Sequence, residues 1–147
     1  MKQKLFGVRN DWTGVVLRLT LGIVMLPHGA QKMLGWFGGP GFQKEMLHLT
    51  EDVQLPWLIS LLVILIEFFG SICILAGLAS RLWAIAFFIL FTGIIFSSHI
   101  EFGFFMNWFG NQSGEGIEYH LLVLGICIAV FLNGSGKFAL DKMLSVK

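Results

Sequence analysis

Long apolar stretches alternate with short polar segments along this chain and predict four membrane-spanning helices. The apolar stretches cover residues 12–34, 56–78, 82–100 and 117–132. The hydrocarbon core of a bilayer is about 30 Å thick, so a helix that crosses it needs roughly 20 apolar residues. The first three stretches meet this length, whereas the fourth, with about 16 residues, needs help from its flanks or a thinner local bilayer. We therefore expect an all-α integral membrane four-helix bundle in which residues 1–147 form one domain.

The composition supports this expectation and excludes other classes of protein. Hydrophobic residues make up 56% of the chain and charged residues 13%, compared with about 25% charged residues in a typical soluble domain. The net charge of +1 excludes a broad basic surface for nucleic acid. The first apolar stretch continues past Arg18 without a small-residue cleavage site, so we expect a retained helix and not a signal peptide. The lipid bilayer is then the main partner of the protein.

Basic residues gather at one end of the predicted bundle. Four spans place both termini on the same side of the membrane, and this side carries eight of the ten Lys and Arg residues. Because positive charge favours the cytoplasmic side, we expect cytoplasmic termini and a multi-pass protein of the cytoplasmic (inner) membrane. The eight residues are Lys2, Lys4, Arg9, Arg18, Arg81, Lys137, Lys142 and Lys147. A link of only three residues, 79–81, predicts that the second and third spans are antiparallel neighbours.

Two ionisable residues are predicted to lie deep in the bilayer. Arg18 comes about one turn inside the first span, and Glu67 lies near the middle of the second. The long side chain of Arg18 can therefore approach the depth of Glu67. Because a charge at membrane depth is unfavourable, we expect one of two arrangements. Either a buried Arg18–Glu67 pair fixes the register of the helices, or Glu67 relays a proton or orients a ligand.

A second polar group is predicted at the outer ends of the helices. His28 and Lys32 are one turn apart on the first helix, His99 ends the third, and the fourth begins with Glu118 and His120. Lipid cannot solvate these side chains, so they must point into the bundle. We expect them to line a pocket that opens on the outer side of the membrane. Plain interfacial residues that face water are the alternative.

The two outer loops are rich in glycine and aromatic residues. They cover residues 36–42 and 102–110 and include Trp36 and Trp108. Glycine favours turns, and tryptophan favours the boundary between lipid and water. We expect these loops to fold back over the outer end of the bundle, where Trp36 and Trp108 cover the pocket and contact its ligand.

The predicted pocket suits proton exchange with a lipid-embedded redox ligand. Histidine titrates near neutral pH, and burial can raise the pKa of a carboxyl group. A quinone needs an apolar slot for its ring and donors for its two carbonyl oxygens, so quinone is the candidate cofactor. The candidate catalytic residues are His28, His99, His120 and Glu118. The candidate ligand-binding residues are Arg18, Lys32, Trp36, Glu67 and Trp108.

A metal centre is the less favoured interpretation of the same residues. Three histidines and a carboxylate can bind zinc or iron, but no helix presents two of these ligands on one face, because Glu118 and His120 are two positions apart. We therefore assign no metal site. The two cysteines, Cys73 and Cys127, fall at different depths, and we expect them to pack as small apolar side chains.

Several motifs in this order resemble those of one family. They are RLTLG at 18–22, PHGAQK at 27–32, GWFGG at 35–39, EFFG at 67–70, Gly77, Arg81, His99, GFFMNW at 103–108, GEGIEYH at 114–120, GSG at 134–136 and LD at 140–141. Together they resemble the DoxX family of small four-helix membrane proteins over about residues 12–141. The resemblance implies a four-helix fold with a short fourth span. It also implies a membrane subunit linked to thiosulfate:quinone oxidoreduction, to thiol and oxidative-stress systems, or to quinone and catechol stress.

The residues and the resemblance leave three hypotheses for function. The leading one is a membrane subunit of a quinone-linked oxidoreductase or of a thiol or oxidative-stress redox system, with a soluble or membrane redox subunit as its partner. The second is a non-catalytic scaffold or assembly partner, which the small size and the glycine-rich helix faces favour. The third is a small transporter, which requires a homo-oligomer because four helices leave little room for a pore.

Overall fold

The computed structural model describes residues 10–145 and is helical, without strands in that range. Its helices include three that are long and apolar enough to cross a membrane: Trp12–Leu34, Trp57–Ala76 and Ser80–Phe102. A shorter apolar helix, Glu118–Asn133, has 16 residues. These elements confirm the predicted all-α fold with several helices able to span a membrane. The fourth apolar stretch is helical, and its crossing of the membrane stays a prediction.

Two of the four long helices are built from more than one segment. The first is α2 (Trp12–Leu34), and the fourth is α7 (Glu118–Asn133). The second runs through α4 (Trp57–Leu65), the π-turn η3 (Ile66–Gly70) and α5 (Ser71–Ala76). The third runs through α6 (Ser80–Ile94), the π-turn η4 (Ile95–His99) and η5 (Ile100–Phe102). The remaining elements are η1 (Trp36–Gly38), α3 (Gly41–Leu47), η2 (His48–Asp52) and α8 (Asp141–Ser145).

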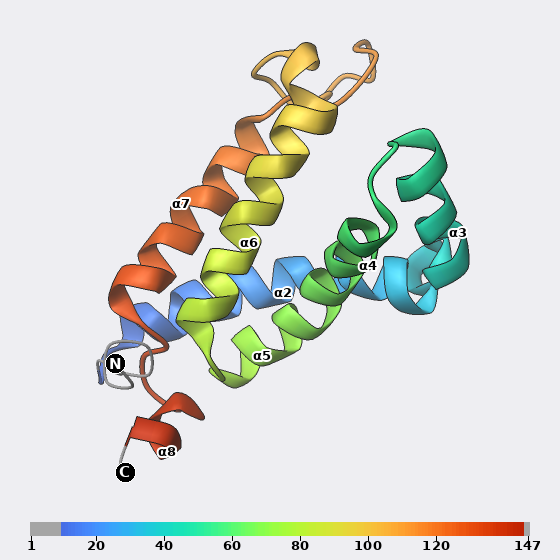
Figure 1. Ribbon diagram of the computed structural model, residues 1–147. Helices are drawn as coiled ribbons and strands as arrows, with labels where there is room; N and C mark the ends of the chain where they lie inside the picture. Colours follow the sequence, from blue (N-terminus) through green and yellow to red (C-terminus); the bar gives the residue numbers. More distant parts are fainter. Residues whose placement is uncertain (1–9, 146–147) are drawn as a thin grey trace.

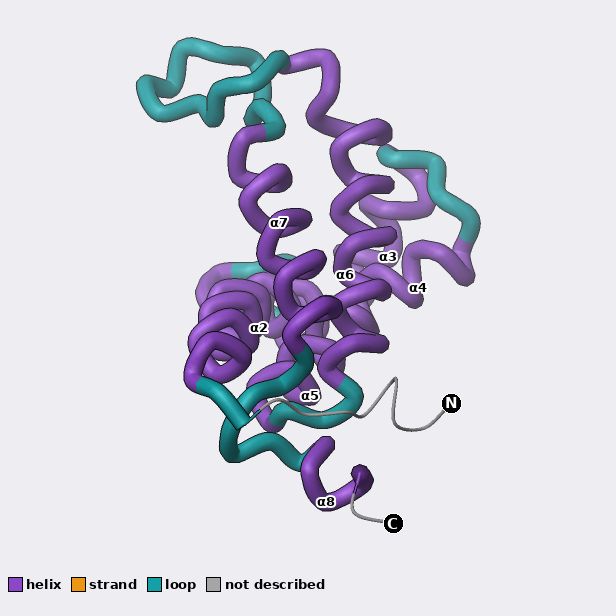
Figure 2. Tube along the Cα trace, turned by 90° about the vertical axis from the view of Figure 1, so that its left-hand side faces the viewer, coloured by secondary structure: helices purple, strands orange, loops and turns teal. Residues whose placement is uncertain are grey.

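The long helices form two pairs that meet at one end and separate towards the other (Figure 1). In one pair α2 packs along α5 and η3, and in the other α6 packs along α7. Figure 2, turned by 90°, shows α2 nearly end-on while α6 and α7 run upwards, so the pairs diverge at a wide angle. We call the end with the α5–α6 turn and α8 the termini end, and the end with the connections 35–56 and 103–117 the loop end.

The divergence limits the predicted antiparallel packing of the second and third spans. Near their short link the two helices are in contact, since a Cβ added at Gly70 would lie 2.8 Å from the Trp83 ring. Beyond this contact α4 and α6 separate. The prediction of antiparallel neighbours is therefore right close to the turn, and farther along a groove lies between the two helices.

Arg18 closes the termini end of the fold. Its guanidinium donates to the carbonyl oxygen of Leu75 and, at 3.2 Å each, to those of Lys137 and Phe138. Leu75 belongs to the last turn of α5, where carbonyl groups have no partner within the helix. The predicted approach of Arg18 to Glu67 is wrong, because Arg18 is level with Leu75. Glu67 lies eight residues earlier, about 12 Å away along a helix.

Asp141 fastens the chain after α7 to the start of α6. Its carboxylate is 1% exposed and accepts hydrogen bonds from the backbone N–H of Ala79 (2.6 Å) and Ser80 (3.1 Å) and from the hydroxyl of Ser135 (2.7 Å). A carboxylate at a helix N-terminus satisfies unpaired N–H groups and interacts favourably with the helix dipole. The connection after α7 is thus held against the second helix pair.

The charge asymmetry of the sequence recurs at this end. The described part of the predicted basic set lies on the segments of the termini end: Arg18, Arg81, Lys137 and Lys142. The other four residues, Lys2, Lys4, Arg9 and Lys147, lie outside the described residues. The cytoplasmic placement of the termini remains a prediction from this charge bias.

Asp141→Asn should lower the free energy of unfolding by about 1–3 kcal/mol, because an amide keeps one acceptor oxygen and turns its NH₂ group towards N–H donors. Thermal unfolding in detergent, followed by circular dichroism, measures the change. Asp52→Asn is the matched control. Asp52 is an exposed residue paired with His48, and its replacement should change stability by no more than about 0.5 kcal/mol. Equal effects of the two substitutions would contradict the assigned role of Asp141.

Candidate functional site

A polar cavity of about 230 Å³ lies between the two helix pairs. The first pair contributes His28 and Lys32 from α2 and Glu67 from η3. The second pair and the connection that follows it contribute the rest of the lining: Phe91, Ile94, His99, Met106, Glu115, Tyr119 and His120. The structure therefore brings His28, Lys32, Glu67, His99 and His120 of the predicted site residues to one cavity.

Two π-turns place acidic and imidazole groups at this cavity. Glu67 lies in η3, and His99 ends η4. A π-turn widens a helix by one residue, and such turns occur frequently at functional sites. In η3 the Ser71 hydroxyl donates to the Glu67 carbonyl oxygen. Apolar periodicity in the sequence does not reveal these turns.

Close packing of α2 against η3 sets Lys32 beside Glu67. A Cβ added at Gly29 would lie 2.5 Å from the backbone of Glu67. Only glycine therefore allows the two backbones to approach this closely. Lys32 follows Gly29 by three residues, so its side chain lies on the same face of α2, towards Glu67.

Lys32 is the cation of a three-membered charge cluster. Its Nζ lies 2.7 Å from Oε1 of Glu67 and 3.7 Å from Oε1 of Glu45, which belongs to α3. Glu67 is only 3% exposed, and its other oxygen, Oε2, has no hydrogen-bond partner among residues 10–145. Sequence reasoning missed Glu45, because its position in a loop between spans gave no reason to place it beside Lys32.

The second helix pair supplies an aromatic and imidazole wall. The ring centroids of His99 and His120 are 4.3 Å apart. Nδ1 of His99 lies 2.8 Å from the carbonyl oxygen of Glu115, which can only accept, so this nitrogen donates and Nε2 of a neutral ring is left as an acceptor. Tyr119, the only tyrosine of the chain, was missed by sequence reasoning. The buried Tyr119 hydroxyl and the buried Nδ1 of His120 have no hydrogen-bond partner among the described residues.

Three unpartnered polar atoms therefore belong to residues around one cavity: Oε2 of Glu67, Oη of Tyr119 and Nδ1 of His120. Buried polar groups are nearly always hydrogen-bonded, and each exception needs a physical explanation. A ligand that both donates and accepts hydrogen bonds would satisfy all three. The arrangement can bind such a ligand and exchange protons with it.

Glu118 lies outside the cavity lining, contrary to expectation. Its Oε1 accepts hydrogen bonds from the backbone N–H of Met106 at 3.0 Å and from the indole N–H of Trp108. Glu118 thus fastens the connection 103–117 at the N-terminus of α7, where a carboxylate is favourable. Its effect on the cavity is indirect, because Met106 is among the lining residues.

The predicted aromatic cover is absent from the described structure. Trp36 is 59% exposed and Trp108 is 75% exposed, and neither lines the polar cavity. The expectation that they cover the pocket is therefore wrong. Exposed indole rings at the ends of membrane helices are typical of the boundary between lipid and water. Arg18 is also absent from the lining, because it binds carbonyl groups at the termini end.

The described residues do not form a metal centre. Among residues 10–145, no group of three His, Cys, Asp or Glu side chains is placed to hold a metal ion. Cys73 and Cys127 are both free thiols.

Removing the positive charge of Lys32 should destabilise the protein through Glu67. Lys32→Met should lower the free energy of unfolding by about 3–5 kcal/mol, because it leaves a buried carboxylate without its cation. Adding Glu67→Gln should restore part of the loss, with a coupling energy of about 0.5–3 kcal/mol. Unfolding of the single and double variants in detergent measures this coupling. Lys44→Met, on the exposed face of α3, is the matched control. If the effects of Lys32→Met and Glu67→Gln on the free energy of unfolding were strictly additive, Lys32 and Glu67 would not interact.

Comparisons with known proteins place the chain in a family. The DoxX family model matches residues 14–100, which include His28, Lys32, Glu67 and His99. A Bacillus subtilis (strain 168) protein named "Putative oxidoreductase CatD" is 26% identical over 127 residues, which span 86% of this chain and 83% of that protein. No solved structure matches the chain. Because the family model covers more than half of the sequence and the helices are apolar enough to cross a bilayer, the chain is a membrane protein that belongs to the DoxX family.

Proposed function

We propose that the polar cavity binds the headgroup of a membrane quinone and exchanges protons with it. The observation that carries this proposal is the set of unpartnered atoms of Glu67, Tyr119 and His120 around one cavity. A quinone offers carbonyl acceptors, and its reduced form offers hydroxyl donors, so the same cavity can satisfy both kinds of protein atom. Phe91 and Ile94 add apolar surface for a flat ring.

The chemistry that a bound quinone supplies is the uptake of two electrons and two protons to give a quinol. A donor of the thiol class balances this reaction, since two thiols form one disulfide and release two electrons and two protons. Thiosulfate is a second donor class, because two thiosulfate ions joined as tetrathionate release two electrons. The printed name of the Bacillus subtilis relative, an oxidoreductase, supports redox chemistry in general.

The residues of the cavity divide between donors and acceptors of protons. The Tyr119 hydroxyl and a protonated His120 are placed to donate to a carbonyl oxygen, and Oε2 of Glu67 is placed to accept from a hydroxyl group. Lys32 stabilises negative charge that develops at the cavity. Its side chain is 24% exposed and contacts both Glu45 and Glu67, which connects the buried carboxylate to solvent. His28 on α2 and His99 at the end of η4 are two further imidazole groups in the cavity lining that could take part in proton exchange.

A scaffold function has less support from the packing of the glycines. A Cβ at Gly22 would meet Leu75, and a Cβ at Gly29 would meet the backbone of Glu67, both at 2.5 Å. Gly70 packs against Trp83 in the same way. These three glycines are therefore used for contacts within the protein, whereas Gly93 on α6 and Gly125 on α7 face open space. A redox partner subunit and a homo-oligomer in the cytoplasmic membrane remain part of the proposal.

Quinone binding tests the proposal directly. A short-chain quinone titrated into purified protein in detergent should quench tryptophan fluorescence to saturation, and solvent extraction of the protein should yield quinone. His120→Phe and Glu67→Gln should each weaken binding by about 10–100-fold, the equivalent of one hydrogen bond to a charged or polar buried group. His48→Phe is the matched control, because His48 is exposed and pairs with Asp52 away from the cavity.

Absence of quinone from the extract, together with no saturable quenching, would overturn the proposal. Turnover adds a second criterion. A dithiol or thiosulfate should reduce added quinone only in the presence of the protein and its partner subunit, and His120→Phe should lower that rate by at least the loss in binding. If His120→Phe reduced quinone at the wild-type rate, His120 would not take part in proton exchange.

A further inference from the structure

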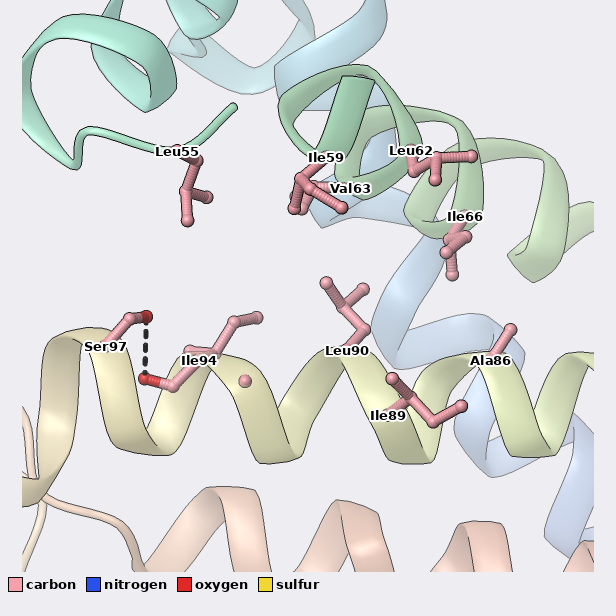
Figure 3. Close-up of a pocket in the computed structure, with 11 residues that line it drawn as sticks. Leu55, Ile59, Leu62, Val63, Ile66, Ala86, Ile89, Leu90, Ile94 and Ser97 are labelled. Atoms are coloured by element: carbon pink, nitrogen blue, oxygen red, sulfur yellow. Dashed lines mark hydrogen bonds between the residues drawn. The ribbon is translucent and has the colours of Figure 1, made fainter. Parts of the chain in front are cut away.

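An apolar groove of about 400 Å³ runs beside the polar cavity, between α4 and α6. Figure 3 shows Ile59, Val63 and Ile66 pointing from α4 and η3 towards α6, where Leu90 points back towards them. The groove is the space that the divergence of α4 and α6 leaves open. Ser97 brings the only side-chain hydroxyl of the lining, and that hydroxyl is hydrogen-bonded to the Ile94 carbonyl oxygen and to Ser98. The groove therefore suits hydrocarbon and offers nothing to a polar ligand.

The groove and the polar cavity share one residue. Ile94 lines both, so the apolar groove and the polar cavity are adjacent at this side chain. The polar cavity alone, at about 230 Å³, is smaller than the roughly 300–1,000 Å³ usual for ligand pockets, whereas the groove alone falls within that range. A ligand with a small polar head and a long apolar chain fits this combination.

We propose that the groove between α4 and α6 holds the isoprenoid chain of the quinone whose headgroup binds in the polar cavity. This inference rests on the proposed function and adds the chemical class of the ligand: a quinone with a long hydrocarbon chain, taken directly from the bilayer. Ile59 and Ile89, at the edges of the groove, are exposed on the surface that faces lipid. The chain can therefore enter sideways from the membrane, past Ile94, while the headgroup reaches Glu67 and His120.

Gly93 keeps the groove open. A Cβ added at this lining position would meet no atom within 4 Å, so the space beside it is empty. Gly125 on α7 is the matched control: a Cβ there would also meet no atom within 4 Å, and this residue lies outside the groove and the cavity. Leucine has a higher helix propensity than glycine, so both Gly93→Leu and Gly125→Leu should fold.

Photolabelling locates the chain. The probe is a quinone whose isoprenoid-like chain carries a diazirine, incorporated with the full-length protein into phosphatidylcholine vesicles. After illumination, mass spectrometry should find the label on α4 and α6 at groove residues such as Leu62, Ile66 and Ile89, and an excess of chainless quinone should abolish it. Gly93→Leu should remove most of this labelling, whereas Gly125→Leu should retain it.

The outcomes separate this inference from the proposed function. If the chainless quinone binds but the label spreads over α7 residues such as Leu122 and Ile128, or survives competition, the groove holds ordinary membrane lipid and the inference is overturned. Equal labelling of Gly93→Leu and wild-type protein would overturn it as well. If the chainless quinone itself does not bind, the proposed function fails, and this inference fails with it.

Discussion

The surrounding lipid offers no hydrogen bonds, and this constraint governs the polar residues of the whole structure. At the termini end the constraint is met in part by two buried charged side chains. Arg18 binds carbonyl groups from α5 and from the chain after α7, and Asp141 binds the N-terminus of α6. Among the described residues, buried atoms without a hydrogen-bond partner remain at both ends: Nε of Arg18 and Oγ of Ser80 at the termini end, and atoms of Glu67, Tyr119 and His120 at the polar cavity. What distinguishes the second group is that its three residues line one polar cavity, where a ligand can reach them.

The shape of the open site follows from local departures from regular helix packing. The π-turns η3 and η4 bring Glu67 and His99 to the cavity, and Gly29 allows α2 to approach η3. The wide angle between the helix pairs separates α4 from α6. The same geometry therefore produces a polar cavity between the pairs and an apolar groove beside it.

The sequence predicts the apolar helices and the shared level of the outer polar residues well. It predicts less well which side chains or carbonyl groups the ionisable residues contact. Apolar runs determine where helices cross the bilayer, and residue counting along them placed His28, His99, Glu118 and His120 at one level. All of these except Glu118 line the polar cavity. Counting does not reveal π-turns or the direction in which a loop folds back. Glu45 was consequently missed, and Arg18 was placed beside Glu67, although the carbonyl groups at the end of α5 lie closer to it.

The cavity depends on residues that do not touch it. Its walls come from two helix pairs, and at the termini end Arg18 and Asp141 bind the chain after α7 to α2, to α5 and to the start of α6. The family model matches the wall that carries Lys32 and Glu67, whereas Tyr119 and His120 follow the matched residues. Two of the three unpartnered atoms thus lie on α7. A ligand that satisfies all three atoms would therefore contact both walls of the cavity.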